Sequence, residues 1–174
     1  MFSDPKTNLE QFGLEKGMKV ADLGVGSGFY VVAAARMVGD LGRVFGVDVQ
    51  KELVAEVKRT AEKEKLENVE VIWGDIEKAE GTKIKEAQLD AVIVSNVLFQ
   101  VEDREGLIKE IARILKPGGK VLVVDWMDSF AGMGPSRTSV VTQEVAESLF
   151  VNLGFRVEKR IDAGDHHYGF VARK

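Results

Sequence analysis

Three glycines at alternate positions, preceded by a carboxylate, are the first feature of the sequence that could do chemistry. Gly24, Gly26 and Gly28 follow an apolar run, and Asp22 stands two residues before the first of them. Glycine lets the backbone turn sharply and come close to a ligand, and the helix expected next offers free N–H groups. A pyrophosphate gains nothing from a nearby carboxylate, whereas a ligand with an ammonium group and no phosphate would be attracted to Asp22. A tight strand-to-helix turn without a ligand is the alternative.

The spacing of these glycines separates two classes of nucleotide ligand. The dinucleotide fingerprint is Gly-x-Gly-x-x-Gly, and its third glycine would fall on Phe29 here. The sequence therefore disfavours a loop that cradles a pyrophosphate. A nicotinamide-dependent (NAD) oxidoreductase stays open as a rival enzyme class.

A second carboxylate follows the next apolar run. Asp48, with Val49 after it, lies 20 residues beyond Gly28, which is close to the spacing of a carboxylate that binds a ribose. Such a group can accept from both ribose hydroxyls, and hydrogen bonds to a charged acceptor contribute about 1.5–3 kcal/mol each. We therefore interpret Asp48 as a ribose-binding residue. The alternative is a solvated carboxylate that caps the following helix.

Polar residues also follow the third and fourth apolar runs. Gly74 permits a turn, Asp75 suits the exocyclic amino group of an adenine, and Ile76 could pack on the ring. Ser95 and Asn96 interrupt an apolar run where a ligand should lie, and neutral groups there would contact it. The alternatives are a helix cap or a turn for Asp75, and local backbone hydrogen bonds for Asn96.

Candidates for an acid–base residue are few. His166 and His167 are the two histidines of the chain and the natural bases near neutral pH. They precede the last expected strand, in a loop that could face either edge of the sheet, and a plain surface turn is the favoured interpretation. Asp125 and Trp126 end the fifth expected strand and are better placed beside a second substrate. Catalytic residues therefore stay unassigned, and no metal site is expected.

The elements that must position these residues alternate between apolar strands and amphipathic helices. We expect strands at 18–23, 43–47, 69–73, 89–94, 120–125, 156–161 and 168–172. We expect helices at 8–12, 28–38, 51–65, 103–115 and 143–152, the last of them capped by Thr142, with a breaker at 116–119 and either a short helix or a loop at 77–88. Strand and helix in alternation imply a doubly wound sheet, whose ligands bind beyond the carboxyl ends of the strands.

Composition limits the class of protein. A chain of 174 residues with 45% hydrophobic and 30% charged residues suits one globular domain. Its formal net charge of -4 argues against a nucleic-acid partner. The absence of cysteine excludes disulfides, thiolate metal sites and cysteine nucleophiles. No secretory signal and no apolar run long enough to span a membrane is visible, so a cytoplasmic location is expected.

Together these motifs resemble those of the class I S-adenosylmethionine-dependent methyltransferases. Five motifs carry the resemblance, at 22–28, 48, 74–76, 89–96 and 115–122, and they cover nearly the whole chain. The resemblance is strongest to the group that acts in ubiquinone and menaquinone biosynthesis. It implies a single domain over residues 1–174, with a short N-terminal segment 1–17, and transfer of a methyl group to a small-molecule acceptor.

The same resemblance implies the fold and the cofactor. The fold would be α/β, a Rossmann-like, doubly wound sheet of seven strands in three α/β/α layers, with strand order 3-2-1-4-5-7-6 and strand 7 antiparallel. The cofactor would be S-adenosylmethionine, and the product S-adenosylhomocysteine. The residues expected to bind this cofactor are Asp22, Gly24, Gly26, Gly28, Asp48, Val49, Gly74, Asp75, Ile76, Ser95 and Asn96.

The N-terminus departs from the family pattern. Many relatives carry helices before the glycine motif that close over the donor, whereas 21 residues precede Asp22 here. The active site is then open, covered by the insert 127–139, or completed by the second subunit of a homodimer. The short N-terminus also keeps open a second class of function, a module that binds S-adenosylmethionine without catalysing transfer.

Overall fold

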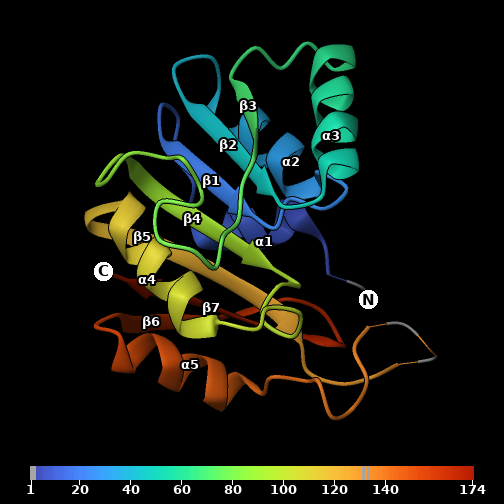
Figure 1. Ribbon diagram of the computed structural model, residues 1–174, viewed down its shortest axis with the longest axis vertical. Helices are drawn as coiled ribbons and strands as arrows, with labels where there is room; N and C mark the ends of the chain where they lie inside the picture. Colours follow the sequence, from blue (N-terminus) through green and yellow to red (C-terminus); the bar gives the residue numbers. More distant parts are fainter. Residues whose placement is uncertain (1–2, 131, 133) are drawn as a thin grey trace.

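A seven-stranded sheet organises the molecule (Figure 1). The computed structural model describes residues 3–130, 132 and 134–174. The strands are β1 Lys19–Leu23, β2 Arg43–Asp48, β3 Val69–Trp73, β4 Leu89–Ser95, β5 Leu115–Trp126, β6 Arg156–Asp162 and β7 His167–Arg173. The helices are α1 Pro5–Phe12, α2 Phe29–Val38, α3 Lys51–Lys63, α4 Arg104–Ile114 and α5 Gln143–Asn152.

The order of the strands across the sheet is β3-β2-β1-β4-β5-β7-β6. Neighbouring strands from β3 to β5 pair in parallel, and β7 pairs antiparallel with both β5 and β6. The predicted order and the predicted antiparallel seventh strand are thus confirmed. Because β7 runs against its neighbours, the turn that precedes it lies at the carboxyl edge of the parallel strands.

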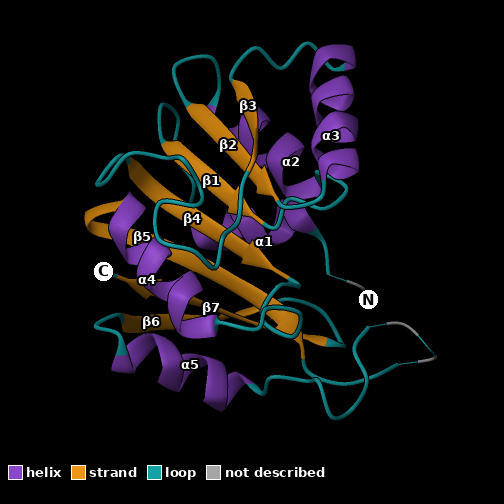
Figure 2. Ribbon diagram, in the orientation of Figure 1, coloured by secondary structure: helices purple, strands orange, loops and turns teal. Residues whose placement is uncertain are grey.

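Helices cover both faces of the sheet (Figure 2). Side chains of α1, α2 and α3 bury one face, and side chains of α4 and α5 bury the other. Alternate residues of β5 show the division, since Val121 and Val123 pack under α4 and α5 while Leu122 and Val124 pack on the opposite side. The three predicted layers are therefore present.

Helix ends follow from the local sequence. Asp4 caps α1 by accepting a hydrogen bond from the Thr7 amide at 2.9 Å, and Pro5 occupies the first turn, where no N–H is needed. Thr142 caps α5, as predicted, by accepting from the Val145 amide at 3.4 Å. Among the described residues, none of the helices is both long and apolar enough to cross a membrane.

The structure changes the predicted start of one strand and decides between the two alternatives for the segment 77–88. The breaker at 116–119 ends α4, but β5 begins at once, at Leu115 rather than at 120. A shift in the pairing of β4 with β5, between Leu89 and Ala91, accommodates this irregular start. The segment 77–88 is a loop, because its backbone N–H groups donate to a side chain: the buried Glu110 carboxylate accepts from the Glu80 amide at 2.9 Å.

Candidate functional site

Two adjoining pockets lie at the carboxyl ends of the central strands, with volumes of about 320 and 380 Å³. Both have Gly24, Gly26 and Gln100 in their walls, so together they form one crevice. The predicted residues that line the first pocket are Asp22, Gly24, Gly26, Gly28, Ser95 and Asn96. The second pocket adds Asp48, Val49, Asp75 and Ile76.

The glycine loop forms the floor between the two pockets. Gly24 and Gly28 adopt left-handed backbone conformations, with φ of +77° and +81°, which glycine reaches at no steric cost. A β-carbon at position 24 would also lie 2.5 Å from Cγ2 of Val97. Both requirements explain why glycine is needed at position 24.

Asp48 is buried and holds the glycine loop in place. One oxygen of its carboxylate accepts from the Gly26 amide at 3.1 Å, and the other accepts from the Gln50 amide at 2.9 Å. The alternative of a solvated carboxylate is therefore wrong. Asp48 connects the loop after β1 with the loop after β2, at the boundary of the second pocket.

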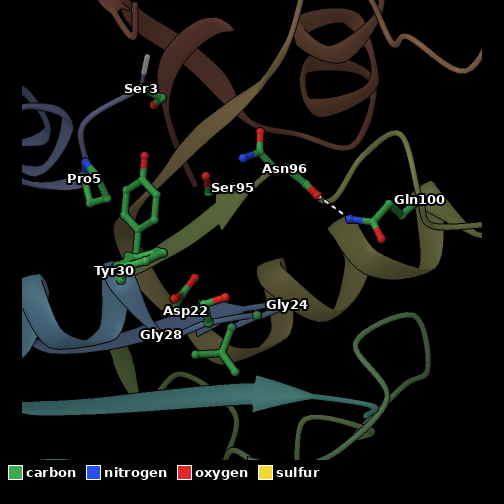
Figure 3. A pocket seen from close by; sticks show the side chains of 13 residues that line it. Ser3, Pro5, Asp22, Gly24, Gly28, Tyr30, Ser95, Asn96 and Gln100 are labelled. Atoms are coloured by element: carbon green, nitrogen blue, oxygen red, sulfur yellow. Dashed lines mark hydrogen bonds between the residues drawn. The ribbon is translucent and has the colours of Figure 1, made fainter. Parts of the chain in front are cut away.

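Asp22 places a buried carboxyl group in the first pocket (Figure 3). Its side chain is only 2% exposed, and burial together with the charge of Asp48 raises its pKa to about 8. Of the described residues that line this pocket, none is a lysine, arginine or histidine. A ligand that brings its own positive charge would therefore find a partner here.

The far end of the second pocket combines a carboxylate with apolar walls. The Asp75 carboxylate accepts from the Glu77 amide at 3.0 Å and lies 3.1 Å from Nζ of Lys78. Asp75 thus forms the turn that was its alternative interpretation and lines the pocket as well. Half-buried Ile76 lies beside it, and Val97 adds a further apolar wall.

Gly74 has a structural position and does not line either pocket. A β-carbon there would lie 2.4 Å from the carbonyl oxygen of Gly81. Because glycine has no β-carbon, two stretches of backbone can approach closely here, and the 77–88 loop can pack behind Asp75. The binding role expected for Gly74 stays a prediction, and its described role is to support the loop that carries Asp75.

The turn after β4 closes the crevice on its other side. Asn96 adopts a left-handed conformation with φ of +57°, its amide donates to the Val124 carbonyl at 2.8 Å, and its carbonyl accepts from Nε2 of Gln100 at 2.7 Å. The side-chain oxygen of Asn96 is buried without a hydrogen-bond partner among the described residues. These bonds are made by the Asn96 backbone and hold the turn, so they do not show the side chain satisfying local backbone groups, and its oxygen is an unused acceptor in the wall of the pocket.

Asp125 supports this turn from below. Its buried carboxylate accepts from the amides of Leu98 and Trp126, both at 2.8 Å, and burial raises its pKa to about 6. It lines neither pocket, so its described role is to fix the backbone that carries Asn96 and Gln100.

Removal of that carboxylate is expected to weaken the fold. Asp125→Ala leaves the buried Leu98 amide without its acceptor, and the unfolding free energy should fall by about 1–3 kcal/mol. Urea denaturation followed by circular dichroism measures this change. The half-exposed Asp128→Ala is the control, expected to change the free energy by less than about 1 kcal/mol. Equal midpoints for the two variants would contradict the assigned role.

The two histidines lie at the same edge of the sheet as the crevice, because β7 is antiparallel. His167 pairs with Trp126 across β5 and β7, their rings 4.2 Å apart. His167 is only 5% exposed, so a plain surface turn is wrong for it. His166 Nδ1 lies 3.0 Å from the Asp128 carboxylate, and Phe130 stacks on its ring. In the insert 127–139, residues 131 and 133 lie outside the described part.

Several residues of the crevice were not predicted, among them Tyr30, Ser3 and Gln100. Tyr30 and Ser3 line the first pocket, and Gln100 lines both. Tyr30 follows the glycine motif directly, and this position was the one signal that could have identified it. Ser3 and Gln100 carry no such signal, because only the packing of α1 and the turn after β4 brings them to the crevice.

Comparison with known proteins gives concordant matches. A family model described as a methyltransferase domain matches residues 14–152. A ubiquinone/menaquinone biosynthesis C-methyltransferase from Haemophilus ducreyi is 35% identical over 118 residues, 66% of this chain and 43% of the relative. A demethylmenaquinone methyltransferase from Staphylococcus aureus is 32% identical over 121 residues, 69% of this chain and 48% of the relative. The chain thus spans less than half the length of these relatives.

Solved structures extend the likeness over the full chain. The crystal structure of a SAM dependent methyltransferase from Aquifex aeolicus superposes with a TM-score of 0.90 at 28% identity. The superposition covers 99% of this chain and 90% of that one. A type 11 methyltransferase structure from Sulfolobus solfataricus, at 24% identity and a TM-score of 0.77, shares the fold.

Proposed function

Since the chain belongs to the class I S-adenosylmethionine-dependent methyltransferases, we propose that it transfers the methyl group of S-adenosylmethionine to a small-molecule acceptor, within a single domain over residues 1–174. The observation that carries this proposal is the distribution of charge along the crevice. Asp22 lies at one end, buried and with no lysine, arginine or histidine among the described residues that line its pocket, and Asp48 and Asp75 follow toward the other end. The ammonium group, the ribose and the adenine of S-adenosylmethionine each need a hydrogen-bond acceptor, and they follow one another in the same spatial order.

The residues of the crevice fit such a donor. The unpartnered side-chain oxygen of Asn96 and the buried carboxylate of Asp22 are acceptors that a cationic ligand would satisfy. In our proposal Asp48 accepts from the ribose hydroxyls, Asp75 from the adenine amino group, and Ile76 packs on the ring. Gly24, Gly26 and Gly28 give the ligand close access to the backbone, with Val49, Ser95 and Asn96 along the walls.

Methyl transfer from S-adenosylmethionine depends more on the alignment of donor and acceptor than on reactive side chains of the protein. When bound, S-adenosylmethionine supplies a methyl group that its sulfonium charge makes electrophilic. The crevice residues hold the donor in one orientation and exclude water, and alignment of this kind can supply several kcal/mol. A reaction with so little need for catalytic side chains is consistent with the absence of any strong catalytic motif in the sequence.

Calorimetry with S-adenosylmethionine and with NAD tests the proposal directly. We expect binding of the first and none of the second, and we expect labelled methyl to appear in small molecules of a cell extract over many turnovers. Binding without turnover would favour the donor-binding module, and tighter binding of NAD would contradict the proposal.

Asp48→Ala is expected to weaken the binding of S-adenosylmethionine roughly 10-fold or more, because about 1.5–3 kcal/mol of hydrogen bonding to a charged acceptor is lost. Isothermal titration calorimetry measures the change. Asp40→Ala is the control, because Asp40 is an exposed carboxylate in the turn between α2 and β2, at the opposite edge of the sheet. Unchanged affinity in a folded Asp48→Ala protein would rule out the ribose assignment.

A further inference from the structure

A polar network extends from the first pocket into the N-terminal helix. Tyr30, the second residue of α2, is 9% exposed and lines the pocket. Figure 3 shows its ring between Pro5 and Ser95, with the hydroxyl on the side of Ser3. Buried Asn8, on α1, donates from its Nδ2 to the Tyr30 hydroxyl at 2.7 Å. The packing of α1 on α2 therefore places a hydrogen-bond donor directly behind this tyrosine.

The network limits the directions in which the tyrosine can donate. Asn8 Nδ2 donates one hydrogen to Tyr30 and the other to Oγ of Ser3, at 2.8 Å. A hydroxyl has one hydrogen to give, and the Tyr30 oxygen already accepts from Asn8. Its own hydrogen must therefore point elsewhere, and the elements around it leave Ser95, Ser3 or a ligand in the pocket as acceptors. Burial raises the pKa of Tyr30, which keeps this hydrogen in place at neutral pH.

The charges of the pocket define what such a donor would recognise. The amino-acid end of S-adenosylmethionine carries an ammonium and a carboxylate. Asp22 matches the ammonium, but among the described lining residues there is no lysine, arginine or histidine to match the carboxylate. Uncharged donors must then meet the carboxylate, and hydrogen bonds to a charged partner are stronger than neutral ones. The pocket offers uncharged side-chain donors from the hydroxyls of Tyr30, Ser3, Ser27 and Ser95 and from the amides of Asn96 and Gln100. Of these, Tyr30 accepts a hydrogen bond from the buried Asn8, which orients its hydroxyl.

We infer that Tyr30, oriented by Asn8, binds the α-carboxylate of the donor, and that residues 3–8 complete this half of the pocket. The inference deepens the proposed function and rests on it. It assigns to the short N-terminal segment a part in donor recognition, with Tyr30 as a contact residue and Asn8 as a positioning residue. The pocket then selects a zwitterion, since Asp22 would repel an isolated anion.

A pair of ligands tests this inference without any knowledge of the acceptor. S-adenosylhomocysteine has the whole amino-acid end, whereas 5′-methylthioadenosine has the same nucleoside and sulfur but no amino acid. Titration calorimetry of Tyr30→Phe is expected to show about 10-fold weaker binding of S-adenosylhomocysteine and an unchanged affinity for 5′-methylthioadenosine. A merely structural role would weaken the binding of both ligands equally.

The other tyrosine of the chain provides a matched control. Tyr168 is also buried, but it packs under α4 and α5 and lines neither pocket. Tyr168→Phe is therefore expected to leave both affinities unchanged. Asn8→Ala should produce the same selective loss as Tyr30→Phe, with little further loss in the double variant, and it keeps the test available if Tyr30→Phe does not fold.

The outcomes are distinct. An unchanged affinity of Tyr30→Phe and Asn8→Ala for S-adenosylhomocysteine, or equal losses for both ligands, would overturn the inference and leave the proposed function standing. A wild-type protein that binds neither ligand would instead contradict the proposed donor site itself, and the inference with it.

Discussion

Replacement of Asp22 with asparagine is expected to weaken the binding of S-adenosylmethionine about 100-fold while raising the stability of the unliganded protein. Breaking a buried ion pair costs about 3–5 kcal/mol. In the wild type the ion pair with the ligand contributes less than this to binding. The Asp22 carboxyl, with a pKa of about 8, must first ionise, which costs about 1.4 kcal/mol at pH 7. The difference corresponds to about two powers of ten in affinity.

The pH dependence of binding follows from the same carboxyl group. The wild-type affinity should rise between pH 6 and 7.5, because a growing fraction of Asp22 is ionised before the ligand arrives. The slope can approach tenfold per pH unit, since one proton is released for each donor bound. Asp22→Asn should show no such slope in calorimetry. A wild-type affinity that is flat over this range would contradict the assignment of the ammonium to Asp22.

The stability of the unliganded protein should change in the opposite sense. The pKa of Asp22 in the folded protein, about 8, lies above the ordinary aspartate value of 3.8. The folded state then binds more protons than the unfolded state between these values, so stability falls as the pH rises from about 4 to 8. Asp22→Asn removes this loss. The variant should therefore melt at a higher temperature than the wild type at pH 8, with little difference near pH 4.

Gly24→Ala is expected to have the second large effect, on both folding and binding. An alanine at φ +77° costs about 1–2 kcal/mol, and the collision of its β-carbon with Val97, at 2.5 Å, adds about 1–3 kcal/mol. Relief of the collision would move a wall of both pockets. We therefore expect the unfolding free energy to fall by about 2–5 kcal/mol and the affinity for S-adenosylmethionine to fall about 10–100-fold.

Gly118 offers a matched control for this substitution. Its φ is +76°, almost the same as that of Gly24, but a β-carbon there meets nothing within 4 Å. Gly118→Ala should thus lower the unfolding free energy only by the cost of a positive φ for alanine, about 1–2 kcal/mol, and leave donor binding unchanged. Val97→Ala in the Gly24→Ala background removes the colliding methyl group and should restore part of the lost stability. Equal urea midpoints for Gly24→Ala and Gly118→Ala would show that the contact with Val97 has no effect.

Much of the crevice could be predicted because its residues stand at the ends of strands. Asp22, Asp48 and Asp75 each follow an apolar run, and in a doubly wound sheet such positions meet at one edge. This local signal needs no knowledge of packing. The same signal selects Gly74, where the structure shows a close approach of two backbones, and position at a strand end does not distinguish such an approach from a binding surface.

The residues that escaped prediction depend on contacts between distant segments. Asn8 and Tyr30 are 22 positions apart and meet only because α1 packs on α2. His167 is buried because β7 pairs it with Trp126, and its sequence neighbourhood of aspartates and glycine is typical of a surface turn. The early start of β5 escaped as well, because a breaker that ends a helix gives no indication of whether a loop or a strand follows.

The position of β7 has a consequence for how the chain is made. Although β7 follows β6 in the chain, it lies inside the sheet, bonded to β5 on one side and β6 on the other. Until residue 173 has left the ribosome, the long, apolar β5 has an unpaired edge, which is a site for association with other chains. The nascent chain therefore cannot protect this edge of β5 until β7 has been synthesised.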